Sequence, residues 1–333
     1  MKNSAGIRHY FLEAFTPYGY ISLLGETLKE IEKAYILSGG LGTGKSTMIK
    51  FIGIQLADRG YDVDYIRSSR EPDSVAGLYL PKSKLCLLNE KEFVLPATLG
   101  SQYYKISLDS LCQQSKLQEH QSRITELAER LTLIEEKVIQ QLKEEYPFHS
   151  QEEKFTIPFR ILSPENNTHR TSSTNNEVIE ILSKVRENCL SYCFLHALQV
   201  DGWLNLAPKY IEDYDRICLE SGDSSKILIE ILQEVSCLGQ VIEIIVNPLR
   251  PDIVLGIVFP EKKLAVWQGN PVKIEEQGFN KVHGEQLREI LEQYKTVRIE
   301  LKNLCNDTIN FRGLDELRHE LLSKILSDLV LWP

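Results

Sequence analysis

The stretch from Gly39 to Thr47, which reads GGLGTGKST, restricts the fold of this chain more than any other feature. It satisfies the pattern G-x-x-x-x-G-K-[ST] in full. Because glycine has no Cβ, several backbone N–H groups of such a loop can turn toward one point. A helix that begins there adds unpaired donors and the positive end of its dipole. The stretch therefore predicts a loop that encloses phosphate groups.

The residues around the loop support this prediction. A short apolar run at residues 34–37 suits a buried strand, and Gly60 stands where a helix would end. Between them, apolar residues recur at helical spacing: Met48, Ile49, Ile52 and Leu56. Residues 61–66, YDVDYI, then resemble a second strand. The order of strand, loop, helix and strand predicts a βαβ crossover.

The motif assigns chemistry to its residues. Lys45 is expected to reach the β- and γ-phosphates of ATP, and the Ser46 hydroxyl to hold Mg²⁺. ATP and Mg²⁺ are thus the predicted cofactors. The predicted nucleotide-binding residues are Gly39, Gly40, Leu41, Gly42, Thr43, Gly44, Lys45, Ser46 and Thr47.

Two blocks of the first half return in the second half. FLEAFTPYGYISL at residues 11–23 aligns without a gap with FLHALQVDGWLNL at residues 194–206. PDSVAGLYLPKSKLCLL at residues 72–88 aligns in the same way with PDIVLGIVFPEKKLAVW at residues 251–267. The order and separation of the blocks are also similar. We interpret this as a duplicated domain.

The second half has lost its phosphate loop. At residues 219–226 it reads LESGDSSK, with a single glycine. Glu220 and Asp223 would place negative charge where phosphate would bind, and Lys226 alone does not restore the site. We therefore expect the second repeat to keep its fold without binding a nucleotide.

The stretches RHYFLEAFTPYGYISL, GGLGTGKSTMIK and PDSVAGLYLP resemble a family of tandem P-loop ATPases from spore-forming bacteria. The resemblance covers most of the chain except its middle. It implies a P-loop NTPase fold, in which helices flank a parallel sheet, and it implies ATP binding. The chain differs from the family in two ways. Asn89 stands near the place of a family aspartate, and the second loop lacks the motif.

Hydrolysis also needs a carboxylate that orders Mg²⁺ or the attacking water. Glu71 and Asp73 follow the second predicted strand, and ends of parallel strands face the nucleotide in this topology. Together with Lys45 they are the catalytic candidates. Asp73 recurs as Asp252 in the repeat without a working loop, which favours a role in capping a turn.

The tripeptide Arg70–Pro72 is similar to a segment of thymidylate-kinase-like enzymes, which implies that Arg70 and Glu71 could contact an acceptor. Three functions therefore stay open. The first is hydrolysis of ATP to ADP and phosphate, with the second repeat as a scaffold or a site for a protein partner. The second is a kinase that phosphorylates a nucleotide or another small-molecule acceptor. The third is a nucleotide sensor without turnover.

The rest of the chain predicts helices and a linker. Residues 113–146 are polar and repeat apolar residues every seven positions, which indicates a long amphipathic helix. Residues 147–177 are rich in Asn, Ser and Thr and are expected to form a linker. The predicted division is a P-loop domain at 1–146, this linker, and a degenerate P-loop-like domain at 178–333. A helix at residues 314–331 is expected to close the second domain.

Composition limits the partners. The net charge of −9 argues against broad nucleic-acid binding, which needs a basic surface. No apolar run approaches the ~20 residues of a membrane span, and the first residues do not resemble a signal peptide. Seven cysteines without metal-ligand spacing are typical of free thiols. We expect a soluble, cytoplasmic protein without membrane association.

Overall fold

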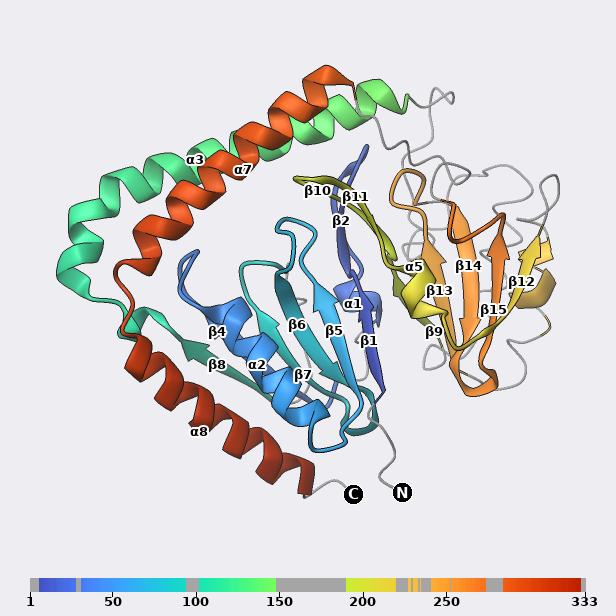
Figure 1. Ribbon diagram of the computed structural model, residues 1–333, viewed down its shortest axis with the longest axis horizontal. Coiled ribbons are helices and arrows are strands. Elements are labelled where there is room, and N and C mark those ends of the chain that lie inside the picture. Colours follow the sequence, from blue (N-terminus) through green and yellow to red (C-terminus); the bar gives the residue numbers. More distant parts are fainter. Residues whose placement is uncertain are drawn as a thin grey trace, which may run out of the picture. The chain divides into compact units, whose positions relative to one another are not determined.

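The computed structural model shows a mixed α/β protein whose main sheets contain parallel strands (Figure 1). The predicted α/β class is therefore confirmed. The structure describes residues 6–27, 31–93, 102–147, 190–219, 227–228, 230–232, 234, 241–251, 253–273 and 284–330.

The chain forms two compact units, and each unit takes residues from both halves of the sequence. The first comprises Met1–Tyr10, Lys29–Val138 and Glu285–Pro333. The second comprises Phe11–Leu28 and Ile139–Gly284. Neither unit is one continuous stretch of the chain.

The first unit contains a six-stranded sheet in the order β1-β5-β6-β7-β4-β8. Its strands are β1 (Ile7–Tyr10), β4 (Lys33–Ser38), β5 (Val63–Arg67), β6 (Val75–Leu80), β7 (Leu85–Asn89) and β8 (Gln102–Ser107). β4 is parallel to both of its neighbours, β7 and β8, and β1 is parallel to β5. β6 is antiparallel to β5 and β7. The predicted pair β4 and β5 is thus separated by the hairpin β6–β7.

The second unit contains a five-stranded sheet in the order β12-β15-β14-β13-β9. Its strands are β9 (Leu190–Cys193), β12 (Asp215–Leu219), β13 (Ile242–Val246), β14 (Val254–Phe259) and β15 (Leu264–Gln268). In sequence order these strands take the same relative places as β1, β4, β5, β6 and β7 in the first sheet. The pattern of parallel and antiparallel pairs is also the same.

Local backbone details repeat between the two sheets. A 3₁₀ turn joins β6 to β7 (η1, Pro81–Ser83), and another joins β14 to β15 (η5, Pro260–Lys262). The residues that follow them, Lys84 and Lys263, have φ of 48° and 51°. Such left-handed conformations are uncommon for a residue with a side chain. The two sheets therefore share a turn geometry as well as a strand order.

Two separate two-stranded sheets, each a hairpin, are also described in the second unit. They are β2 (Glu13–Thr16) with β3 (Gly19–Ser22), and β10 (His196–Gln199) with β11 (Gly202–Asn205). A one-turn helix follows each, namely α1 (Leu24–Thr27) and α5 (Ala207–Tyr210). Phe11 and Phe194, which occupy matching places in the two aligned blocks, each donate a backbone N–H to the other's carbonyl at 2.9 Å.

Four long helices are described. They are α2 (Lys45–Ala57), α3 (Gln114–Glu145), α7 (Glu285–Asn306) and α8 (Phe311–Val330). A 3₁₀ turn, η2 (Asp109–Leu111), precedes α3. The long helix predicted at 113–146 is confirmed as α3. Within the first unit α3 runs beside α7, where Arg123 forms an ion pair with Glu300 at 2.5 Å (Figure 1).

The helix α8 packs on α2 in the first unit, so the prediction that it closes the second domain is wrong (Figure 1). Leu321, Leu322, Ile325 and Leu329 of α8 are buried in one core with residues of α2 and the first sheet. At the edge of this core, Tyr35 and Lys33 of β4 both contact the Asp328 carboxylate. Helical spacing showed the apolar face of this segment, but not which sheet the face would cover.

Several predictions fall on residues that the structure does not describe. They are the altered loop at 220–226, Asp252 and residues 148–177 of the linker. In the ranges that the structure does describe, every helix is too short or too polar to cross a membrane.

Two equivalent glycines generate the first testable prediction. A Cβ on Gly256 of β14 would overlap the rigid Trp267 indole, whereas a Cβ on Gly77 of β6 would meet a methyl of Leu88 at 2.7 Å. The leucine can relieve the overlap by changing its rotamer, whereas moving the indole costs more free energy. We expect Gly256→Ala to lower the free energy of unfolding by about 2–3 kcal/mol and Gly77→Ala by about 1 kcal/mol. Urea unfolding of both variants tests this order, and equal losses would contradict it.

Candidate phosphate-binding site

The glycine-rich stretch forms a tight turn between the end of β4 and the start of α2. Gly39, Gly42 and Gly44 have φ of 134°, 76° and 86°, a region that residues with a Cβ rarely adopt. Gly44 is also the N-cap of α2, so the helix begins at Lys45. A Cβ on Gly42 would lie 2.8 Å from the carbonyl oxygen of Lys302 on α7. The loop therefore needs glycine both for its curl and for its contact with α7.

The Lys45 side chain lies inside this turn. Lys45 is only 4% exposed, and its ammonium donates to the carbonyls of Gly39 and Gly40 at 2.8 and 2.5 Å and to the Thr43 hydroxyl at 3.0 Å. Burial lowers the pKa of Lys45 to about 8, although the nearby Glu92 and Asp109 carboxylates act in the opposite direction. The loop thus holds a cation that a phosphate group could attract.

One amide of the loop already binds an anionic group. The backbone N–H of Gly40 donates to the Asp109 carboxylate at 3.2 Å. Asp109 lies in η2, directly after β8, and β8 is parallel to β4. The contact shows that the turn presents a donor that can bind a negative oxygen.

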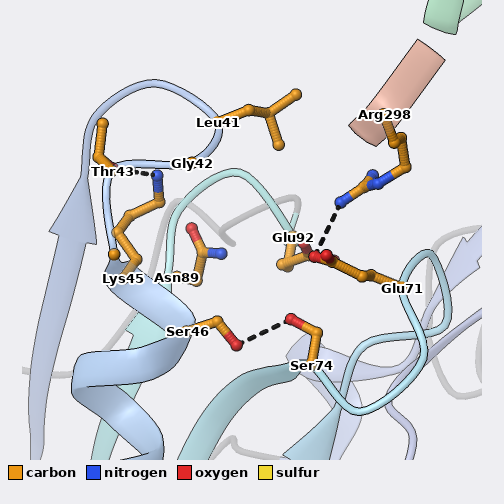
Figure 2. Close-up of a pocket in the computed structure, with 11 residues that line it drawn as sticks. Leu41, Gly42, Thr43, Lys45, Ser46, Glu71, Ser74, Asn89, Glu92 and Arg298 are labelled. Carbon is orange, nitrogen blue, oxygen red and sulfur yellow. Dashed lines mark hydrogen bonds and ion pairs between the residues drawn. The ribbon is translucent and has the colours of Figure 1, made fainter. Parts of the chain in front are cut away.

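Ser46 faces the next strands of the sheet. Its hydroxyl lies 2.8 Å from the Ser74 hydroxyl (Figure 2). It also accepts the backbone N–H of Val75 at 2.8 Å. Thr47 is exposed and does not line the pocket. Of the two hydroxyl residues after Lys45, Ser46 is therefore the one placed to contact a ligand.

The sheet brings further polar groups to the loop. β4, β5 and β7 run in one direction, so their carboxyl ends meet at one edge, where ligands bind in open α/β sheets. A small pocket of about 50 Å³ forms there. Its lining residues are Leu41, Gly42, Thr43, Gly44, Lys45, Ser46, Glu71, Ser74, Asn89, Glu92 and Arg298 (Figure 2).

The acidic residue Glu92 was missed by the analysis of the sequence. It lies three residues beyond Asn89, the last residue of β7, and is only 5% exposed. The Ser68 hydroxyl donates to its carboxylate at 2.8 Å. The sequence pattern that could have pointed to Glu92 was an apolar run followed by acidic residues. That pattern could not be interpreted before β7 was known to be the parallel neighbour of β4.

The two predicted carboxylates lie in different surroundings. Glu71 lines the pocket and pairs with Lys302 at 2.6 Å and with Arg298 at 3.5 Å. The Asp73 side chain is 94% exposed, lies 3.5 Å from Arg67 and is not part of the lining. Asp73 also has φ of 57°, which suits its predicted place in a turn. The structure thus brings Glu71 to Lys45 and Ser46 and leaves Asp73 outside.

The basic residue Arg298 was also missed. It comes from α7, far from the loop in the sequence, and its side chain is 11% exposed. It donates to the Tyr294 hydroxyl at 3.1 Å and lies against the Tyr294 ring. Figure 2 shows it reaching toward Glu71. No local motif could have found it, because only the packing of α7 places it there.

The residues present fit a hydrated Mg²⁺ ion bound together with phosphates. No group of three or more His, Cys, Asp or Glu side chains within the described ranges is placed to hold a metal alone. Mg²⁺ in nucleotide sites usually keeps several waters and takes few protein ligands besides phosphate oxygens. Ser46, Asn89 and Glu92 supply oxygen atoms to the same pocket, and Mg²⁺ prefers such ligands.

Comparisons of the chain with family models, with curated proteins and with solved structures gave no match.

The buried lysine generates a prediction on stability. The folded chain releases the Lys45 proton near pH 8, while an unfolded lysine keeps it to about pH 10.4. Between these values the unfolded chain binds more protons, so the free energy of unfolding rises with pH. Relative to Lys45→Met, the wild-type protein is expected to gain about 1 kcal/mol between pH 8 and pH 9. Urea unfolding at both pH values measures this gain, and a constant difference would contradict it.

Proposed function

We propose that this chain binds ATP with Mg²⁺ at the loop between β4 and α2, and that it is a P-loop NTPase which hydrolyses ATP to ADP and phosphate. One observation carries the proposal. The glycine-rich loop, Lys45 and Ser46 share a pocket with carboxylates at the carboxyl ends of strands parallel to β4. A loop of this shape, with a helix N-terminus and a buried cation, suits a polyphosphate.

We further infer that the two halves are repeats of one fold. The aligned sequence blocks, the equal strand orders of the two sheets and the left-handed Lys84 and Lys263 all support this inference. Residues 220–226 have only one glycine and carry two acidic residues, Glu220 and Asp223. Both features suggest that only the first repeat binds a nucleotide. The second repeat would then be a scaffold or a docking site for a protein partner.

The proposed reaction assigns a role to each group. A water molecule attacks the terminal phosphorus while the bond from that phosphorus to the bridging oxygen breaks, which releases ADP and phosphate. Lys45 would bind the β- and γ-phosphates, and bound Mg²⁺ would neutralise charge on their oxygens. Glu92, buried and held by Ser68, would orient the water and accept its proton. Glu71 is a second candidate, since it lines the same pocket.

A nucleotide sensor without turnover is the second candidate function. It is favoured by Asn89, an amide at the end of β7, where a carboxylate would suit hydrolysis. The kinase hypothesis has weaker support in the described residues. Of its two predicted acceptor contacts, Glu71 lines the pocket, but Arg70 donates instead to Glu135 of α3 at 2.9 Å and does not line it.

The role of Lys45 is directly testable. Lys45→Ala is expected to abolish ATP binding in a calorimetric titration, because the phosphates lose their main counter-ion. Lys50→Ala is the matched control, since Lys50 is an exposed lysine of the same helix that lies outside the pocket. It should bind ATP as the wild-type protein does. Unchanged affinity of Lys45→Ala would refute the proposed site.

The role of Glu92 separates hydrolysis from sensing. If the chain hydrolyses ATP, Glu92→Gln should bind Mg-ATP with near wild-type affinity and release phosphate about 10²-fold more slowly or worse. The measurement is bound nucleotide together with released phosphate for both proteins. Tight binding by the wild-type protein without any phosphate release would select the sensor. Phosphate release by Glu92→Gln at the wild-type rate would assign the reaction to another group.

A further inference from the structure

Among the residues that the structure describes, two cations line the pocket. They come from different parts of the chain. Lys45 belongs to the loop itself, and Arg298 belongs to α7. The pocket also holds two carboxylates, Glu71 and Glu92, so its formal charge without a ligand is about zero. A bound nucleoside triphosphate would bring several negative charges, and part of this charge lies on the terminal phosphate. Arg298 is the available cation that the loop motif does not account for.

The position of α7 against the loop is fixed by close contacts. A Cβ on Gly42 would lie 2.8 Å from the Lys302 carbonyl oxygen and 3.0 Å from the Cys305 Cβ, so α7 rests directly on the turn. Arg298 lies one helical turn before Lys302 on the same helix. The Tyr294 hydroxyl donates to Glu135 of α3 at 2.7 Å, which also holds this part of α7 in place. The guanidinium is therefore presented to the pocket by a packed helix.

The contact of Arg298 with the Glu71 carboxylate is long. It measures 3.5 Å, longer than a strong charge-assisted bond, while Lys302 binds the same carboxylate at 2.6 Å. If Arg298 moved to a phosphate, Lys302 would still neutralise Glu71. A guanidinium also matches the oxygens of a phosphate with two parallel donors. Glu71 would therefore keep a cation if Arg298 exchanged partners.

We propose that Arg298 contacts the terminal phosphate of a bound nucleoside triphosphate, so that this chain supplies its own arginine to the site and distinguishes triphosphate from diphosphate. The inference rests on the proposed function, because it needs a nucleotide on the loop. It adds a residue from α7, outside the glycine-rich motif. In phosphoryl transfer such an arginine neutralises the charge that develops in the transition state.

The test compares two probes, ADP and a non-hydrolysable ATP analogue, each with Mg²⁺ in calorimetric titrations. Arg298→Ala is expected to lose at least tenfold in affinity for the analogue and less than about twofold for ADP. Arg288→Ala is the matched control, because it removes an exposed cation from the same helix outside the pocket. It should leave both affinities unchanged. Equal losses for the two probes, or no loss, would overturn the inference and leave the proposed function standing.

Two further variants keep the test decisive if Arg298→Ala does not fold. Arg298→Lys keeps the charge but loses the paired donors, so it should lose affinity for the analogue by a smaller factor. Glu71→Gln removes the competing carboxylate and should raise affinity for the analogue several-fold with little change for ADP. A fall in affinity for the analogue with Glu71→Gln would overturn the inference. If the wild-type protein binds neither probe, the proposed function and this inference both fail.

Discussion

The contact between the glycine-rich turn and α7 is the constraint on which the rest of the site depends. Gly42 can approach the Lys302 carbonyl because it has no side chain, and its left-handed φ turns the loop at that point. The same contact sets the height of α7 over the loop and so brings Arg298 to the pocket. The shape of the loop and the presence of Arg298 in the site therefore both depend on Gly42. A β-branched residue there would disturb both.

Much of the first sheet around the loop could be predicted from local pattern. The buried strand β4, the start of α2 at Lys45 and the long helix α3 all follow from glycines and apolar periodicity. Periodicity does not specify neighbours. It could not show that β6 and β7 separate β5 from β4, nor that α8 covers α2. These arrangements depend on which apolar surfaces meet, and that information is spread over the whole chain.

The candidate site was predictable to the same extent. The loop residues form a recognisable sequence motif, and Glu71 was predicted because it follows a strand. Glu92 and Arg298 belong to no sequence motif. The first needs the knowledge that β7 lies beside β4, and the second needs the packing of α7. Asp73 shows the opposite case, since nearness in sequence to Glu71 did not bring its side chain to the pocket.

The place of α7 and α8 has a consequence for how the protein is made. During synthesis the ribosome releases β4, the loop and α2 long before it releases these two helices. Until then the apolar face of α2 that meets Leu321 and Ile325 has no cover, and the pocket lacks its arginine. The early part of the chain therefore lacks part of its core until its late part is made. Nascent chains stalled before α7 would be the form most exposed to chaperones and proteases.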